Sequence, residues 1–192
     1  MKKKSSKLKN VEIEVRFLEI DKKILLKRLN ELGAKDLGEE LLRESIFYDK
    51  NGNWAKEHKF ARIRTDKSGS IFSYKHYMEH TVDGTLEIEF PVVDIEKMRA
   101  FLDEVGVEEF RIQEKRRHKF IFDDVVVDID EWPNIPAYVE LEGESEENLK
   151  KVAEKLGLSW KNAVFENAKI VIEERYNIPV SKYKYFTFEK ME

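Results

Sequence analysis

The sequence contains no cysteine among its 192 residues. Without thiols the chain forms neither disulfide bonds nor thiolate metal sites, and a reducing compartment is permitted. No apolar run approaches the roughly 20 residues of a membrane-spanning helix, so no membrane partner is expected. The basic start of the chain lacks the apolar segment of a secretory signal, and we therefore expect a cytoplasmic location.

A large net charge is also missing. Lysine and arginine number 35 against 39 aspartates and glutamates, which gives a net charge of −4. Such a chain has no overall attraction to nucleic acid, and no nucleic-acid partner is expected. Charged residues nevertheless make up 39% of the chain. If charge matters for function, its arrangement matters and not its sum.

Common catalytic motifs are absent as well. No Gly-x-x-x-x-Gly-Lys-Ser/Thr loop occurs, which excludes P-loop chemistry, and no Gly-x-Ser-x-Gly elbow presents a nucleophilic serine. The four histidines lack the paired spacing of a zinc site, and we interpret them as surface or rim residues. They are His58, His76, His80 and His118.

The length suits one domain, with no clear linker. We expect residues 1–10 to be a disordered basic tail and residues 11–192 to be a single domain with a C-terminal helix and tail. Alternating or β-rich runs predict strands at 11–18, 41–48, 60–65, 71–77, 85–93, 110–122, 125–129 and 137–142. Asp21, Asp94 and Ser145 each precede a predicted helix that a glycine ends, and a fourth helix is predicted at 163–175.

The positions of charges within these strands are the informative feature. Glu12, Glu14 and Arg16 are spaced two residues apart, so they share one face of a strand whose other face is apolar. The same spacing recurs in acidic pairs and in basic pairs. The acidic pairs are Glu87/Glu89, Asp128/Asp130 and Glu140/Glu142; the basic pairs are Arg62/Arg64 and Lys115/Arg117, and Lys75 follows Ser73 on one face.

A sheet with one solvated face would explain each strand taken singly. The separation of acidic from basic strands favours a closed barrel with helices packed outside and charges pointing inward. In such a tunnel, arginine and lysine would hold phosphate groups, and carboxylates would hold Mg²⁺ or Mn²⁺. These are the parts that phosphoryl transfer requires.

Glu12-Ile13-Glu14-Val15-Arg16 resembles the N-terminal Glu-x-Glu-x-Lys signature of the CYTH superfamily, the triphosphate tunnel metalloenzymes. That group includes class IV adenylyl cyclases, thiamine triphosphatases and inorganic triphosphatases. Later elements follow in a similar order over residues 11–158. The resemblance implies an α+β fold, built as a closed eight-stranded antiparallel β-barrel with helices outside, and a small triphosphate-containing molecule as its partner.

The resemblance also implies roles for individual residues. Substrate binding would fall to Arg62, Arg64, Lys75, Lys115 and Arg117. Metal binding would fall to Glu12, Glu14, Glu140 and Glu142, with Glu87, Glu89 and Asp130 as supporting carboxylates or ligands of a second metal. Glu12, Glu14 and Arg16 would form the catalytic group. Arg16 departs from the signature lysine, and an arginine does not lose its proton, so it keeps only orientation and charge.

Three functions remain open at this point. We favour metal-dependent hydrolysis of inorganic or organic triphosphate; the alternatives are a class IV adenylyl cyclase and a non-catalytic triphosphate-binding module. Trp132 and its neighbouring prolines indicate a rigid turn, or else an aromatic that stacks on a ring at a tunnel mouth. The basic and aromatic tail after Pro179 is interpreted as packing against the barrel end or against the second subunit of a homodimer.

Overall fold

The computed structural model describes residues 11–78 and 85–192, and for residues 11 and 12 it describes only the backbone. The predicted basic tail, residues 1–10, and His80 lie outside this described part.

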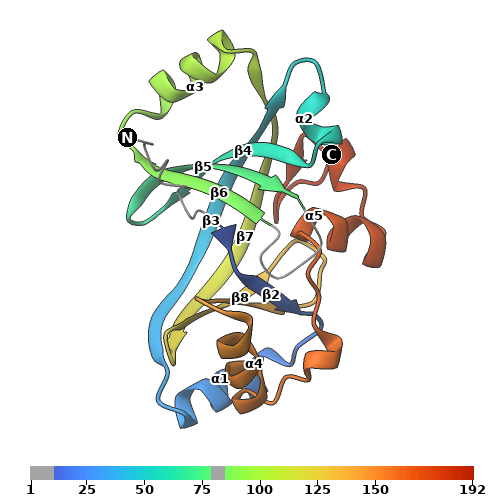
Figure 1. The fold of residues 1–192 in the computed structure, drawn as a ribbon. Coiled ribbons are helices and arrows are strands. Elements are labelled where there is room, and N and C mark those ends of the chain that lie inside the picture. The colour runs from blue at the N-terminus through green and yellow to red at the C-terminus, as the bar shows by residue number, and fades with distance from the viewer. Residues whose placement is uncertain (1–10, 79–84) are drawn as a thin grey trace, which may run out of the picture.

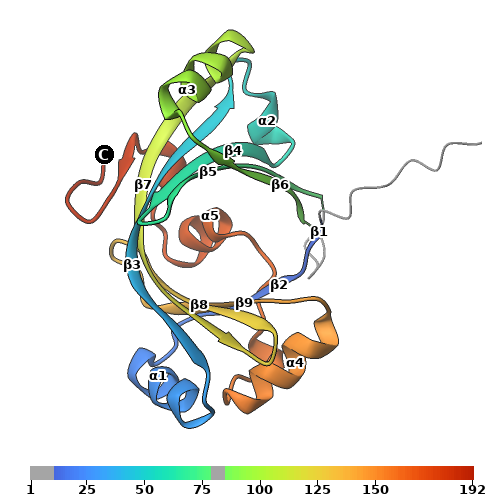
Figure 2. The same cartoon turned by 90° about the vertical axis from the view of Figure 1, so that its left-hand side faces the viewer.

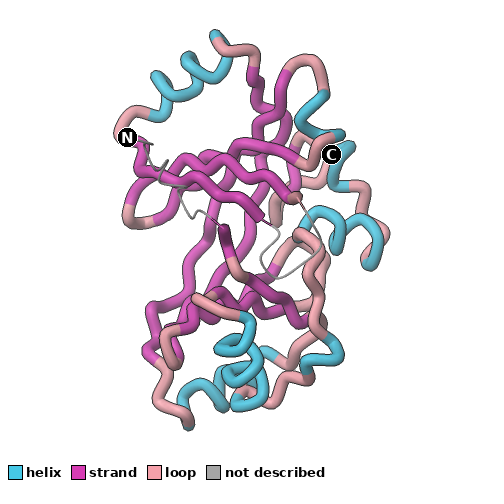
Figure 3. The backbone as a smooth tube through the Cα atoms, viewed as in Figure 1, coloured by secondary structure: helices cyan, strands magenta, loops and turns pink. Residues whose placement is uncertain are grey.

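One curled sheet organises the described chain (Figures 1 and 3). Its neighbouring strands run in the order β1-β6-β5-β4-β3-β7-β8-β9-β2, all antiparallel, and β10 adds to β7 in parallel. Their bounds are β1 (Val11–Glu12), β2 (Glu14–Phe17), β3 (Lys35–Asp49), β4 (Lys59–Asp66), β5 (Gly69–Tyr77), β6 (Thr85–Val92), β7 (Val107–Phe122), β8 (Val125–Glu131), β9 (Tyr138–Glu142) and β10 (Tyr185–Phe186). The α+β class and the curled antiparallel sheet are confirmed, and the closed barrel stays a prediction.

Two helices cover the outer face of β2, β8 and β9. They are α1 (Lys22–Glu31) and α4 (Glu146–Lys155), which bury Leu29 and Leu149 against Val15, Val127 and Leu141. The predicted helix starts are confirmed, because the carboxylate of Asp21 and the hydroxyl of Ser145 accept hydrogen bonds from the backbone three residues on.

A second core lies under the other half of the sheet. Here α3 (Ile95–Glu104) and a short helix that the sequence did not predict, α2 (Asn53–Lys56), pack near Phe47, Ile63, Phe72 and Leu102. Among residues 11–78 and 85–192, no helix is both long and apolar enough to cross a membrane.

The long strands β3 and β7 connect these two halves, and they pair along most of their length with register shifts at two places. Alternate residues of a strand point to opposite faces. Arg111, Gln113, Lys115 and Arg117 therefore all line the hollow of the sheet. The intervening Glu114, which obscured the pattern in the sequence, forms an ion pair with Arg43, whose side chain is 60% exposed.

The predicted helix over 163–175 is wrong in its first half. Val164 and Arg16 exchange two backbone hydrogen bonds of 2.9 Å, so this part of the chain is extended. Helical structure begins at α5 (Ala168–Ile170), where Asn167 accepts a hydrogen bond from Ile170, and continues as a π-helical turn, η2 (Val171–Arg175). Figure 2 shows α5 within the hollow of the curled sheet.

Two short helical turns, η1 (Trp160–Asn162) and η3 (Val180–Lys182), and the strand β10 complete the chain. Phe186 of β10 is fully buried with Trp132 and Tyr138, and its ring stacks on Trp132 at 5.8 Å. The tail therefore packs against the sheet, and its predicted place at the end of a closed barrel stays a prediction. A homodimer stays a prediction.

Candidate triphosphate site

The hollow of the sheet contains a cavity of about 470 Å³. Ten lysine and arginine residues and eight aspartate and glutamate residues line it. The lining is therefore richer in positive than in negative side chains, although the whole chain carries a net charge of −4. Such a cavity favours anionic ligands.

Nearly all the predicted site residues meet here. The cavity lining includes the predicted phosphate-binding residues Arg62, Arg64, Lys75, Lys115 and Arg117, and also Glu14, Arg16, Glu87, Glu89, Glu140 and Glu142. The side chain of Glu12 lies outside the described part. Asp130 is fully buried and does not line the cavity.

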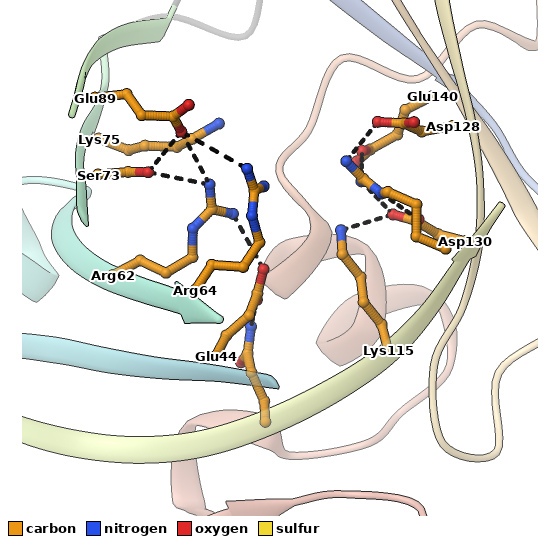
Figure 4. A network of polar contacts seen from close by, with 12 residues as sticks. Glu44, Arg62, Arg64, Ser73, Lys75, Glu89, Lys115, Asp128, Asp130 and Glu140 are labelled. Carbon is orange, nitrogen blue, oxygen red and sulfur yellow. Dashed lines mark hydrogen bonds and ion pairs between the residues drawn. The ribbon is translucent and has the colours of Figure 1, made fainter. Parts of the chain in front are cut away.

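One side of the cavity, here called the β4–β6 wall, consists of Glu44, Arg62, Arg64, Ser73, Lys75, Glu87 and Glu89. Figure 4 shows all of these residues except Glu87. Arg62 lies 3.3 Å from Glu44 and 3.6 Å from Glu87. Lys75 lies 3.3 Å from Glu87, and Arg64 lies 3.9 Å from Glu89. Most of these separations exceed the 2.7–2.9 Å of a tight charge-assisted hydrogen bond.

The opposite side, here called the β7–β9 wall, consists of Glu14, Arg16, Lys115, Arg117, Asp128, Glu140 and Glu142, with Asp130 behind them. Figure 4 shows Lys115, Asp128, Asp130 and Glu140 on its right. Arg117 contacts Asp130 and Glu140, each at 2.6 Å, and it also donates to Asp128. Lys115 lies 2.7 Å from Asp130. Asp130 therefore sits behind two cavity-facing cations and holds both, rather than presenting its oxygens to a ligand.

Arg16 joins β2 to β9 and to the chain before α5. Its guanidinium donates to Glu140 at 2.7 Å, to Glu14 at 2.9 Å and to the backbone oxygen of Glu166 at 2.9 Å. Burial acts to lower the pKa of Arg16, but Glu14 and Glu140 outweigh it and hold the pKa well above its usual value. Arg16 is thus a fixed cation that orients two predicted metal ligands.

Burial and neighbouring charges shift the pKa values of two carboxyl groups in the cavity in opposite directions. Burial would raise the pKa of Glu140, but Arg16, Lys115 and Arg117 bring it well below its ordinary value. At Asp128, burial dominates over Arg117 and the pKa is raised. Asp128 also has one buried oxygen without a hydrogen-bond partner among the described residues.

The described carboxylates fit a divalent cation in chemistry and only partly in arrangement. Glu14 and Glu142 lie directly opposite each other in the β2–β9 pairing and both line the cavity. Carboxylate oxygens suit Mg²⁺ or Mn²⁺, and Glu14 is held in place by Arg16 at 2.9 Å. Within the described ranges, no three acidic or histidine side chains gather as a metal-binding group.

Sequence reasoning missed two kinds of site residue. Glu44 is 1% exposed in the β4–β6 wall, but it is the one charged residue on its face of an otherwise apolar stretch. Gln113 and Arg111 line the cavity from β7. Their position was not predicted, because charged residues lie on both faces of this strand and its alternating pattern cannot be recognised in the sequence. Trp132, interpreted as a turn residue or as a ring at a tunnel mouth, is buried, and Lys115 lies 5.2 Å from the centre of its ring.

A curled antiparallel sheet thus encloses a hollow whose lining is rich in cations and suits an anionic ligand. The model of the CYTH domain family matches residues 10–170, and the chain belongs to this family. A candidate adenylate cyclase of Methanocaldococcus jannaschii is 26% identical over 133 residues, which span 69% of this chain and 76% of that protein.

Solved structures share the fold. A candidate adenylate cyclase from Vibrio parahaemolyticus superposes with a TM-score of 0.73 at 13% identity, covering 85% of this chain and 98% of that one. The PH1012 protein of Pyrococcus horikoshii gives 0.67 at 22% identity, with 81% and 96% covered. HpAC1 of Hippeastrum, a candidate adenylyl cyclase described as having a dominant triphosphatase activity, gives 0.62 at 15% identity, with 86% and 96% covered.

Proposed function

We propose that this protein hydrolyses a triphosphate compound, inorganic or organic, with the help of a divalent metal ion. The observation that carries the proposal is the β4–β6 wall. Arg62, Arg64 and Lys75 line the cavity from two adjacent strands, and the ion pairs given for them span 3.3–3.9 Å. A triphosphate offers these cations shorter, charge-assisted hydrogen bonds from several oxygens.

The site would be a closed tunnel. β1 pairs with β6 at one end of the strand order, and β2 pairs with β9 at the other end. Only Ile13 separates β1 from β2 in the chain. This arrangement supports the predicted eight-stranded barrel, with the segment from β1 to β2 joining its two edges. Closure would exclude water and strengthen the electrostatic contacts inside.

The residues of this site would have different roles in binding and catalysis. Glu14 and Glu142, with Glu12, would hold Mg²⁺ or Mn²⁺, and Glu87 and Glu89 are proposed as supporting carboxylates. The metal would neutralise phosphate charge and make a bound water more acidic. Arg16 orients Glu14 and Glu140 and keeps its proton. Lys115 and Arg117 face the substrate from the wall opposite Arg62 and Arg64.

An adenylyl cyclase is the second candidate. Four aromatic residues line the cavity: Trp132, Tyr48, Phe60 and Tyr77. Phe60 and Tyr77 stack with ring centres 6.1 Å apart, and Tyr48 lies 6.5 Å from Phe60. Such a surface suits a nucleobase. The names of two relatives favour this function, whereas the triphosphatase activity ascribed to HpAC1 favours hydrolysis.

A paired assay separates the candidates. Purified protein with Mg²⁺ or Mn²⁺ receives inorganic triphosphate or ATP, and both released phosphate and cyclic AMP are measured. Glu14→Ala tests the site, and Glu114→Gln, whose side chain pairs with Arg43 away from the cavity, is the matched control. We expect phosphate release that Glu14→Ala abolishes and Glu114→Gln retains. Cyclic AMP would instead establish the cyclase. Triphosphate binding with neither product would leave a binding module.

A further inference from the structure

A buried line of hydrogen bonds joins the C-terminal segment to Arg62. The guanidinium of Arg111 donates to the backbone oxygen of Val180 and to Oε1 of Gln113, both at 2.9 Å. Nε2 of Gln113 donates to Glu44 at 2.7 Å, and Arg62 donates to the other oxygen of Glu44 at 3.3 Å. The line crosses from η3 through β7 and β3 to β4.

The donor and acceptor roles along this line allow one arrangement only. An arginine can only donate, so the amide oxygen of Gln113 must face Arg111 and its NH₂ group must face Glu44. Glu44 is ionised, because Arg62, Lys115 and the Gln113 hydrogen bond outweigh its burial and lower its pKa to about 2. It therefore accepts from both neighbours, and its position is fixed from the side opposite the substrate.

This line contributes to stability, but stability does not require charged groups at these positions. Glu44, Arg111 and Gln113 are 1%, 3% and 8% exposed, and buried charged groups of this kind are often replaced by apolar side chains without loss of stability. What these hydrogen bonds do achieve is a defined orientation of the side chains that they join. The line connects a cavity-facing cation to the backbone oxygen of Val180 through Glu44, which contacts the guanidinium of Arg62 in addition to Ser73, Glu87 and Glu89.

This line of hydrogen bonds ends at Val180, which lies beyond residue 170, the last residue that the family model matches. Val180 is buried, and the neighbouring Ser181 donates from its backbone to Glu173 at 2.7 Å. β10 then pairs with Ile112 and Gln113 of β7. The C-terminal segment thus holds the stretch of β7 that contains Arg111 and Gln113.

We propose that Arg111 and Gln113 are positioning residues, which hold Glu44 and, through it, the guanidinium of Arg62 toward the bound triphosphate. The C-terminal segment anchors them through Val180. The proposal rests on the proposed function, because it takes a triphosphate as the ligand of Arg62. It assigns the residues after 175 a part in ligand binding.

The test is the affinity for inorganic triphosphate, measured by calorimetry in EDTA and again with Mg²⁺. We expect Gln113→Leu to raise Kd about tenfold, the size expected when one charge-assisted hydrogen bond is lost. Arg111→Lys keeps the charge but cannot donate in the same fork geometry, and we expect a smaller rise of about threefold. The matched control is Glu114→Gln, the next residue on the opposite face of β7, which should leave Kd unchanged.

A double-mutant cycle with Arg62→Ala separates positioning from general damage. If Gln113 acts through Arg62, Gln113→Leu has no further effect on Kd once Arg62 is alanine. An equal tenfold loss in both backgrounds would overturn the positioning role, as would a folded Gln113→Leu protein with native affinity. If Gln113→Leu does not fold, the same cycle with Arg111→Lys decides. A native protein that binds no triphosphate under either condition would overturn the proposed function and this proposal together.

Discussion

The two walls of the cavity contain the same kinds of residue and differ in how tightly the charges are paired. In the β7–β9 wall, the ion pairs of Arg16, Lys115 and Arg117 span 2.5–2.9 Å. In the β4–β6 wall, the ion pairs that Arg62, Arg64 and Lys75 form with Glu44, Glu87 and Glu89 span 3.3–3.9 Å. The first wall is cross-linked by its own charges, and the second holds cations that an incoming anion can approach at lower cost.

Two carboxylates, one from each wall, also differ in how deeply their side chains are buried. Asp130 is fully buried in the β7–β9 wall, whereas the side chain of Glu89 in the β4–β6 wall is 39% exposed. Removing one member of a buried pair leaves an uncompensated charge, but an exposed pair contributes little. Substitutions in the β7–β9 wall should therefore act mainly on stability, and those in the β4–β6 wall mainly on ligand binding, except at Glu44, which is 1% exposed.

The largest expected effect is that of Asp130→Ala. Lys115 and Arg117 would both lose a buried partner, and we expect the free energy of unfolding to fall by about 3–5 kcal/mol. Urea unfolding measures it, and Glu89→Ala is the matched carboxylate of the other wall, with an expected loss below about 1 kcal/mol. Equal losses in the two variants would remove the distinction between the walls.

Glu44 should make the free energy of unfolding depend on pH in the acid range. Its pKa is about 2 in the folded protein against an ordinary 4.5, so it contributes roughly 3 kcal/mol that is fully present above pH 4.5. This contribution is lost as the pH falls from about 4.5 toward 2, because the unfolded chain takes up the proton first. Urea unfolding of the native protein and of Glu44→Gln at pH 6 to 3 should show the difference between them shrinking. A constant difference would mean that Glu44 is not held ionised.

Ligand affinity is the corresponding test of the β4–β6 wall. Arg64→Ala removes one charge-assisted contact, and we expect the Kd for triphosphate to rise between ten- and a hundredfold with little change in stability. Arg43→Ala changes net charge equally, but Arg43 is 60% exposed and pairs with Glu114 away from the cavity. If Arg43→Ala weakened binding as much, the effect of Arg64 would be long-range attraction and not contact.

Local sequence signals predicted much of this architecture. Asp21, Asp94 and Ser145 cap helices as expected, because a cap depends only on the next three residues. The alternation in Arg62-Ile63-Arg64 and in Glu140-Leu141-Glu142 placed those side chains in the cavity correctly, because strand geometry alone puts alternate residues on one face.

Tertiary contacts determine the features of the structure that the sequence did not predict. Asp128 and Asp130 share a strand face, yet only Asp128 lines the cavity, because Asp130 lies beneath Lys115 and Arg117. The predicted helix over 163–175 failed where Val164 pairs with Arg16, about 150 residues away in sequence. No pattern within either segment encodes such a partner.

The smallest expected effect is that of Glu89→Gln, and it bears on whether the β4–β6 wall holds a metal. Glu89 lies 3.9 Å from both Arg62 and Arg64, so its loss should leave the free energy of unfolding within about 1 kcal/mol of native. Without metal, triphosphate should bind roughly two- to fivefold more tightly, because one repelling charge has gone. Calorimetry in EDTA measures this change, with Glu114→Gln as the variant of equal charge outside the cavity. If Glu89→Gln binds triphosphate more weakly than the native protein once Mg²⁺ is added, Glu89 contributes to metal binding as well as to the ion pairs with the arginines. Weaker binding of triphosphate by Glu89→Gln in EDTA would contradict the ion-pair role given to it here.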